Sequence, residues 1–437
     1  MSDARVPAPS TGSADPEQDQ TPAEAATATE PTGPAEPAEP GWLRRLPGQL
    51  VLPFLAVLTA LLIGAFLIVL SDPVLLALWT ANPLKAAEES ARAVLEGYGA
   101  LISGALGSPR AYVEAFASGD IEAIKLAFRP LSETVLAATP LIFTGLAVAL
   151  GFRSGLFNIG AEGQLYLGAI IATFVGFSIH GLPWFIHLPL TIAAGFLGGA
   201  LWGFIPGILK ARTGAHEVIV TIMLNYIAYS LVTWVLRQPF YQRPGRPDPV
   251  SPVVDPAAMI PQLIDGLRMN WAFVLALLCA ALVSWLLFRS TLGYEFRAVG
   301  LNPGGARYAG INISRTLILT MSLCGGLAGL AGATEIIGVN KALTPGFSPG
   351  YGFDGIAIAL LGGSSPLGVV LAALLFGGLR AGATPMQAAT GIPIDLVVVI
   401  QALVIMFVAA PALIREIYRI KARRTTGTEI LAQGWRA

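Results

Sequence analysis

Long apolar runs separated by short polar segments dominate this chain between residues 50 and 411. A helix needs roughly twenty apolar residues to cross a bilayer, and the run LVLPFLAVLTALLIGAFLIVL (50–70) meets this requirement without a single charge. Similar runs predict transmembrane helices over residues 131–151, 160–180, 188–209, 215–236, 271–288, 316–338 and 393–411. The pattern therefore predicts an all-α polytopic membrane protein.

One apolar stretch, between residues 354 and 380, is interrupted by the segment GGSSP. Residues 354–363 are too short to cross a bilayer alone. If both termini lie on the same side, the number of crossings is even and this stretch must contribute two of them. Irregular backbone at membrane depth is tolerated where protein or a cavity lines it, so we expect a broken or re-entrant helix here. The prediction is about ten transmembrane helices, with eight full crossings and a re-entrant hairpin as the alternative.

The Lys and Arg residues between the apolar runs predict the orientation, because such residues favour cytoplasmic loops. Four basic segments fall on one side: Arg44–Arg45, Lys210 with Arg212, the loop 289–315 and the tail 415–424. One loop on the other side, 237–270, carries four arginines and conflicts with this assignment. Four segments against one predict that both termini are cytoplasmic, in the inner (plasma) membrane of a cell.

The composition separates two tails from the membrane region. Residues 1–40 hold eight prolines and eight acids with one arginine, and such a segment buries too little apolar surface to fold. We expect a disordered, acidic, Pro/Ala-rich cytoplasmic tail over 1–40, a transmembrane domain over 41–415 and a basic cytoplasmic tail over 416–437. Charged residues are only 12% of the chain, about half of what soluble domains carry.

Residue types that usually carry catalysis or metal binding form no recognisable pattern. The two cysteines lie in apolar runs and the three histidines are scattered: Cys279, Cys324, His180, His187 and His216. GYGFDG (350–355) matches a dinucleotide-binding pattern, but it follows no predicted strand. The sequence predicts no metal, no cofactor and no enzymatic site.

Small residues recur at helical spacing in two of the apolar runs. They are Gly195, Gly199, Gly203 and Gly207 in one run and Gly325, Gly329 and Gly332 in the other. Small residues four apart allow helix backbones to approach closely in lipid. These glycines predict helix-packing faces rather than ligand sites.

The loop 289–315 contains a helix start within NPGGARYAGI (302–311). Asn302 is suited to cap a helix, and Pro303 is favourable in the first helical turn because its missing N–H costs nothing there. A short helix from 303 to about 309 is predicted. The four arginines of the loop are consistent either with contact to anionic lipid or with docking of a soluble partner.

The stretch GLFNIGAEGQLYLG (155–168) places Asn158, Glu162 and Gln164 where a membrane helix begins. Polar residues at this depth usually face an interior cavity and mark a transport path. Alternatively, Asn158 caps the helix while the other two side chains bond to neighbouring helices. Asp354 and Asp395 also lie near predicted helix starts, where capping and the helix dipole favour an acid.

Four motifs occur together in the chain: PLIFTGLAVALGFRSG, GLFNIGAEGQ, RAVGLNPGGARYAGI and GFDGIAIALLGGSSPLG. In these the sequence resembles the permease subunits of bacterial ABC importers for simple sugars and nucleosides, a branched-chain amino-acid-like permease family. The resemblance covers residues 50–415, and GLFNIGAEGQ is similar to the nucleoside branch. The chain departs from the family at Gly304–Gly305, where helix-favouring residues are expected, so the loop helix should be short.

The resemblance implies a translocation path for a small-molecule substrate, a nucleoside or simple sugar, with Asn158, Glu162 and Gln164 as path residues. It also implies an ATPase coupling loop over 289–315. The coupling residues it implies are Asn302, Pro303, Arg307, Tyr308 and Gly310.

The partners it implies are ABC ATPase subunits, a second permease subunit (homologous or identical) and a substrate-binding lipoprotein. The chain itself is expected to contact the lipid bilayer and no nucleic acid. No GxxxxGK[ST] motif occurs in the sequence, so ATP hydrolysis is expected in separate subunits. The alternative is an ion-coupled secondary transporter, which needs carboxylates near the bilayer midplane. The acids Glu162, Glu335, Asp354 and Asp395 lie near span ends instead.

Overall fold

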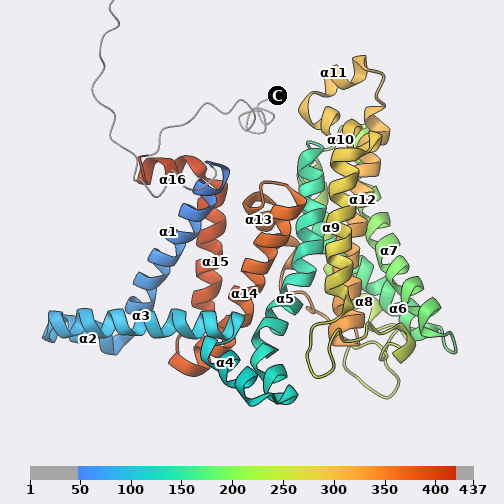
Figure 1. Cartoon of the computed structure of the whole chain (residues 1–437). Helices are drawn as coiled ribbons and strands as arrows, with labels where there is room; N and C mark the ends of the chain where they lie inside the picture. Colours follow the sequence, from blue (N-terminus) through green and yellow to red (C-terminus); the bar gives the residue numbers. More distant parts are fainter. Residues whose placement is uncertain (1–47, 420–437) are drawn as a thin grey trace, which may run out of the picture. The chain divides into compact units, whose positions relative to one another are not determined.

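The computed structural model describes residues 48–419, and within this range the chain is helical apart from connecting loops (Figure 1). The predicted acidic tail and most of the predicted basic tail lie outside the described residues. The one β-bridge in this range joins Gln262 to Asn270. The all-α class predicted from the apolar runs is confirmed.

Seven helices of the described range are long and apolar enough to cross a membrane. They are α1 (Gly48–Ser71), α5 (Ile121–Arg153), α7 (Trp184–Thr213), α8 (Glu217–Val235), α9 (Trp271–Arg289), α12 (Ile313–Glu335) and α14 (Pro366–Thr390). The pair α15 (Ile394–Ala409) and α16 (Pro411–Ile417), bent by 91°, raises the number to eight. The predicted number of about ten is slightly above this count, because α6 (Ala161–Ser178) and the eleven-residue α13 (Tyr351–Leu361) are apolar helices that are not among these spans.

The interrupted stretch is a broken helix, as predicted. The short helix α13 ends in a tight turn, and α14 then begins with Ser365 as its cap, accepting from the N–H of Gly368 at 3.2 Å. In the turn, Gly363 and Ser364 have positive φ angles of 60° and 51°. The Arg153 side chain at the end of α5 donates to the carbonyl of Ser364 at 2.9 Å. This contact holds the turn against the end of α5.

The glycine faces of α7 and α12 lie against each other. A Cβ at Gly199 would lie 2.1 Å from the carbonyl oxygen of Gly325, and one at Gly203 would lie 2.3 Å from that of Met321. A Cβ at Gly195 would lie 2.4 Å from the Cβ of Ala333. Only glycine permits backbones to approach this closely. The third predicted glycine of α12, Gly332, faces α6 instead, since a Cβ there would lie 2.0 Å from the carbonyl oxygen of Leu165.

Three helices between α1 and α5 were not predicted. They are α2 (Pro73–Ala81), α3 (Pro83–Leu106) and α4 (Pro109–Ser118), and α2 and α3 run crosswise to α1 (Figure 1). Each begins with a capping side chain followed by proline: Asp72, Asn82 and Ser108. This cap-and-proline signal is present in the sequence and identifies helix starts. Because these helices are too short or too polar to resemble spans, hydropathy alone did not reveal them.

The remaining described elements are short. Helices α10 (Thr291–Leu301) and α11 (Pro303–Tyr308) connect α9 to α12, and a π-helical turn (Ile336–Asn340) follows α12. The segment between α8 and α9 is irregular apart from one 3₁₀ turn (Pro256–Ala258). Figure 1 shows α10 and α11 at one end of the helices and the α8–α9 segment at the other.

Candidate functional site

The start of α6 is held by a closed pair of side-chain amides. The Nδ2 of Asn158 donates to Oε1 of Gln164 at 2.8 Å, and Nε2 of Gln164 donates to Oδ1 of Asn158 at 3.2 Å. Oδ1 of Asn158 also accepts from the N–H of Gly160 at 3.1 Å. Both side chains are fully buried. The two amides therefore satisfy each other at the helix start.

A second amide, on α8, holds the same helix start from another side. Oδ1 of Asn225 accepts from the N–H of Gly163 at 2.8 Å, and its Nδ2 donates to the carbonyl of Ile159 at 3.0 Å. The first N–H groups of a helix lack partners within the helix, so Asn225 satisfies one of them. We did not predict this residue, although a lone asparagine in the apolar run 215–236 was a usable signal.

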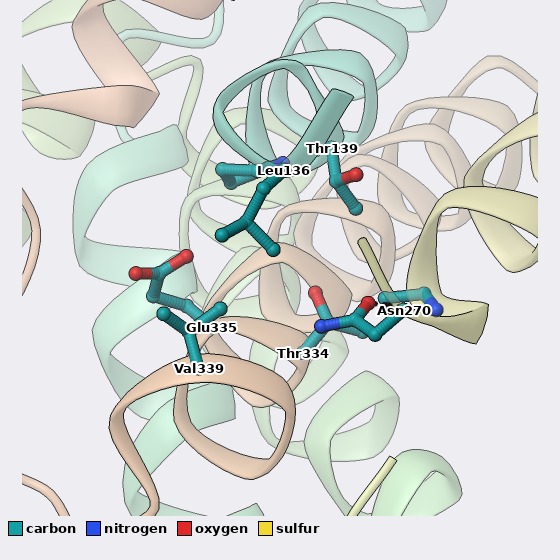
Figure 2. A pocket seen from close by; sticks show the side chains of 8 residues that line it. Leu136, Thr139, Asn270, Thr334, Glu335 and Val339 are labelled. Atoms are coloured by element: carbon teal, nitrogen blue, oxygen red, sulfur yellow. Dashed lines mark hydrogen bonds between the residues drawn. The ribbon is translucent and has the colours of Figure 1, made fainter. Parts of the chain in front are cut away.

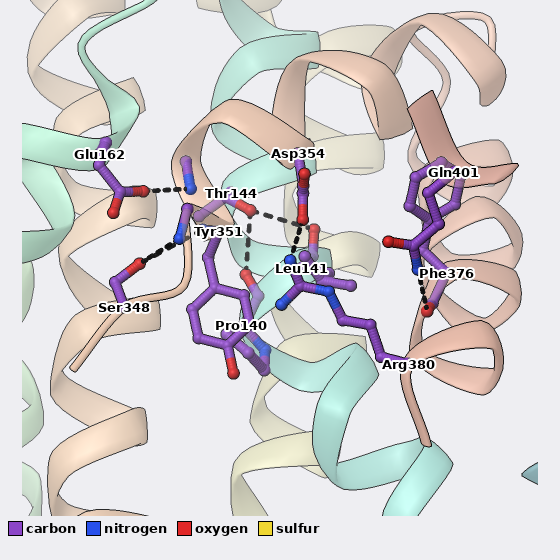
Figure 3. Close-up of polar contacts among 12 residues, drawn as sticks. Pro140, Leu141, Thr144, Glu162, Ser348, Tyr351, Asp354, Phe376, Arg380 and Gln401 are labelled. Atoms are coloured by element: carbon purple, nitrogen blue, oxygen red, sulfur yellow. Dashed lines mark hydrogen bonds and ion pairs between the residues drawn. The ribbon is translucent and has the colours of Figure 1, made fainter. Parts of the chain in front are cut away.

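Glu162, in the first turn of α6, binds the first turn of α13. Its Oε2 accepts from the N–H of Gly352 at 2.6 Å (Figure 3). A Cβ at Gly352 would lie 2.2 Å from the backbone nitrogen of Glu162, so the two helix starts are in direct contact. The residue before α13, Gly350, has no capping side chain. The carboxylate therefore lies between two positive helix ends, which favour an acid.

An ion pair holds α13 against α14. The carboxylate of Asp354 accepts from Nη2 of Arg380, and the guanidinium carbon lies 5.0 Å from the centre of the Tyr351 ring (Figure 3). Asp354 lies in the first turn of α13, as expected for the helix dipole, but its carboxylate pairs across to α14 instead of capping. We did not predict Arg380, the only cation within the apolar run of α14.

We call this set of contacts the α6–α13 junction: Asn158, Glu162, Gln164, Asn225, Gly352, Asp354 and Arg380. The other predicted acids lie elsewhere. Asp395 is in the first turn of α15 and makes no capping bond. Glu335, at the end of α12, accepts from Nδ2 of Asn340 at 3.4 Å.

A small cavity lies beside Glu335, between α5, α9 and α12 (Figure 2). Its volume of about 10 Å³ accommodates roughly one water molecule, whereas ligand pockets usually measure about 300–1,000 Å³. Asn270 forms one wall, where it caps α9 by accepting from the N–H of Ala272 and donates to the carbonyl of Gly338. This cavity is too small for an organic substrate.

The predicted loop helix is α11. Asn302 caps it by accepting from the N–H of Gly305 at 3.0 Å, and Pro303 occupies its first position. The helix has six residues, and Gly310 follows with a φ of 80°. The side chain of Tyr308 is 97% exposed, and Arg307 is also exposed. The cap and the chain turn thus hold an arginine and a tyrosine in solvent at one end of the helices.

Comparison with known proteins identifies the family of this chain. Residues 131–409 match the family described as the permease component of branched-chain amino acid transport systems. The chain belongs to this family. The match extends from α5 to α15 and includes the α6–α13 junction and the loop with α11.

Three curated relatives carry more specific names. The guanosine ABC transporter permease protein NupP of Bacillus subtilis is 43% identical over 290 residues, which cover 65% of this chain and 82% of the relative. The nucleoside ABC transporter permease protein NupB of Lactococcus lactis is 38% identical over 69% of this chain and 84% of its own length. The glucose ABC transporter permease protein TsgB13 of Haloferax volcanii is 37% identical over 66% of this chain and 78% of its own length. No solved structure matches the chain.

Proposed function

We propose that this permease forms the translocation path of an ATP-driven importer for nucleosides. The observation that carries the proposal is the similarity to the guanosine permease, which extends over more than four fifths of that relative. A glucose permease is also similar, and a nucleoside contains a sugar. The substrate class is therefore the first point to test.

The proposed partners are separate ATPase subunits, a second permease and a substrate-binding lipoprotein. In this proposal α11 is the surface that contacts an ATPase subunit, with Asn302 and Pro303 forming the helix start and Arg307 and Tyr308 presented to the partner. Exposure of these two side chains supports that role. Gly310, in its left-handed conformation, ends the helix and returns the chain to α12.

We propose further that both termini are cytoplasmic, which places α11 on the cytoplasmic side and the α8–α9 segment outside. Three of the four arginines of that segment, which conflicted with this orientation, are bonded to other groups of the chain, and Arg237 is exposed. Arg246 pairs with Asp248 at 2.8 Å, Arg268 pairs with Glu133 at 3.0 Å, and Arg243 donates to the Ser251 carbonyl. Arg246 also lowers the pKa of Asp248 below its usual value. Arg243 and Arg246 are bonded within the segment and Arg268 to α5, so these three are weaker orientation signals than free arginines.

We propose that Asn158, Glu162 and Gln164 act on the translocation path indirectly, by holding in position the helices that form it. Each side chain is buried and bonded within the chain. These contacts support an action on the position of α6, α8 and α13 more than a direct contact with substrate.

The test is reconstitution of the permease with its ATPase and lipoprotein partners in proteoliposomes. We expect ATP-dependent uptake of labelled guanosine that unlabelled nucleosides reduce and glucose does not. Uptake driven by an ion gradient without ATP would instead support a secondary transporter. Uptake of glucose alone would contradict the nucleoside assignment.

A matched pair of variants tests the coupling surface. Arg307→Ala should leave the complex assembled in the membrane but reduce guanosine uptake for each ATP hydrolysed. Arg110→Ala removes an exposed arginine from α4, at the other end of the helices, and should change neither value. Unchanged uptake in Arg307→Ala would contradict the coupling role of α11.

A further inference from the structure

The exposed face of α8 changes character along the helix. Near its start the face is apolar, with Ile219 and Met223 more than half exposed. Two turns later the same face forms an open groove of about 460 Å³. Its lining residues are Tyr229, Ser230, Thr233, Trp234 and Arg237. We call this feature the α8 groove.

The α8 groove combines two aromatic rings with hydroxyl groups and a guanidinium. Trp234 is 57% exposed, and Ser230 and Arg237 are exposed as well. Within residues 48–419, Arg237 pairs with no carboxylate. Polar and ionisable groups on a membrane helix face an interior or a water-filled space, because hydrocarbon does not solvate them. The polar groups in this half of α8 are solvated where it faces a water-filled space or the membrane interface.

The hydroxyl groups in the groove keep hydrogen-bonding capacity. Oγ1 of Thr233 donates to the carbonyl of Tyr229, one turn earlier, at 3.0 Å, which leaves the oxygen free to accept. A hydroxyl group has one donor and two acceptor positions. Ser230, on the adjacent turn, can both donate and accept.

The α8 groove adjoins the α6–α13 junction through aromatic contacts. The ring of Tyr229 meets that of Tyr166 edge to face, with centres 5.0 Å apart. Tyr166 lies one turn after Glu162 on α6, and its ring is 4.8 Å from that of Phe347, in the segment leading to α13. The groove is thus continuous with the segments that the junction holds.

We propose that the α8 groove is the nucleoside-contacting wall of the translocation path. The exposed ring of Trp234 offers a face to a purine base, since aromatic side chains stack on any base, and Tyr229 lies half-buried in the same groove. The ribose hydroxyls match Ser230 and Thr233 as donors and acceptors. Arg237 provides the paired N–H donors that recognise O6 and N7 of guanine.

This assignment rests on the proposed nucleoside import. The groove is open and lined by residues of one segment, 229–237, so it provides one wall and not an enclosed site. The orientation proposed above places the groove in the outer half of the membrane, next to the α8–α9 segment. That is the side from which a lipoprotein would deliver its substrate.

The test uses single cysteines in the reconstituted complex. Cys279 is first replaced by alanine, and the buried Cys324 is kept. Ser230→Cys is compared with Met223→Cys, seven residues earlier on the same face. We expect a water-soluble maleimide to label Ser230→Cys, and guanosine with the lipoprotein and ATP to slow that labelling by about tenfold. Labelling of Met223→Cys should not respond to guanosine.

Two other occupants of the groove give different results, and each overturns the assignment. If a second permease fills it, the water-soluble reagent does not label Ser230→Cys under any condition, and a cysteine cross-link to the partner forms. If lipid covers it, only a membrane-permeant reagent labels the position. Absence of guanosine uptake in the unmodified complex would overturn the proposed function itself. Normal uptake without protection of Ser230→Cys would overturn the groove alone.

A second measurement needs no labelling. Arg237→Gln keeps a hydrogen-bonding side chain but loses the paired donors, so guanosine uptake should fall by about tenfold relative to uridine uptake. Trp234→Leu should slow the uptake of both nucleosides. Equal preference for guanosine in Arg237→Gln and the unmodified complex would contradict the contact assigned to Arg237.

Discussion

The α6–α13 junction and the α8 groove are both polar regions of a membrane protein, but their side chains differ in what they contact. In the junction, Asn158 and Gln164 bond to each other and Glu162 bonds to a backbone N–H of another helix. In the groove, Ser230 and Arg237 are exposed and directed away from the helices that pack on α8. The regions are adjacent, since Tyr166 and Tyr229 are in contact.

The difference shows that a polar residue in a membrane helix has two distinct uses. A buried side chain whose bonds are all made within the chain fixes the position of helices, and a ligand would have to displace those bonds. An exposed side chain with free hydrogen-bonding capacity is available to a ligand without that cost. We therefore expect changes in the junction to reduce stability first and changes in the groove to reduce transport first.

The largest effect is expected from breaking the ion pair of the junction. Arg380→Met leaves the carboxylate of Asp354, which is 23% exposed, without its partner; a fully buried pair costs about 3–5 kcal/mol when broken, and we expect about 3 kcal/mol for this partly buried one. The thermal unfolding temperature of the detergent-solubilised permease should fall sharply. Adding Asp354→Leu removes the unpaired charge and should restore most of the loss. A single variant as stable as the unmodified protein would show that the pair does not hold α13 in place.

The next largest effect is expected at the contact between the two helix starts. Gly352→Ala adds a Cβ that would lie 2.2 Å from the backbone of Glu162, and overpacking of this kind costs about 3 kcal/mol. Gly99→Ala is the control, because a Cβ there, within α3, meets nothing within 4 Å. Alanine should stabilise α3 slightly. Equal unfolding temperatures for the two variants would contradict the close contact of α6 and α13.

A smaller effect is expected when the amide pair is opened. Gln164→Leu leaves Nδ2 of Asn158 without an acceptor and should cost about 1–2 kcal/mol. Uptake should fall only in proportion to the loss of folded complex. Ser230→Ala in the groove should do the opposite, with reduced uptake at an unchanged unfolding temperature. Loss of uptake at full stability in Gln164→Leu would instead show that this residue contacts the substrate directly.

Much of the fold could be predicted because hydropathy is a local property of the sequence. The apolar runs identify the spans, and Asn302 with Pro303 identifies the start of α11, since both signals depend on neighbouring residues. The crosswise helices α2–α4 carry the same cap-and-proline signal as α11. Hydropathy does not identify them because α2 and α4 are too short, and α3 too polar, to resemble spans.

The partners in the junction could not be predicted in the same way. Glu162 and Gly352 are 190 residues apart, and only the packing of α6 against α13 brings them together. Arg380 was visible as a cation in an apolar run, but its carboxylate partner depends on the angle of the broken helix. The groove could not be predicted, because Ser and Thr are common in membrane helices. Ser230 and Thr233 can be assigned to a groove only once the structure shows that they lie on one open face of α8.

The smallest effect on stability is expected from removing the cap of α11, and it separates an exposed structural contact from a functional surface. Asn302→Ala removes the bond to the N–H of Gly305, which weakens this six-residue helix locally by about 1 kcal/mol. The global unfolding temperature should not change, because α11 is exposed and only Ala306 of its residues is buried. Asn82→Ala is a matched control, since Asn82 caps α3 before Pro83 in the same way. Guanosine uptake per ATP hydrolysed should fall in Asn302→Ala and not in Asn82→Ala. Of the two capped helices, only α11 presents Arg307 and Tyr308 to the proposed ATPase partner. An equal decline in both variants would mean that the loss comes from general loosening of capped helices and not from the surface of α11.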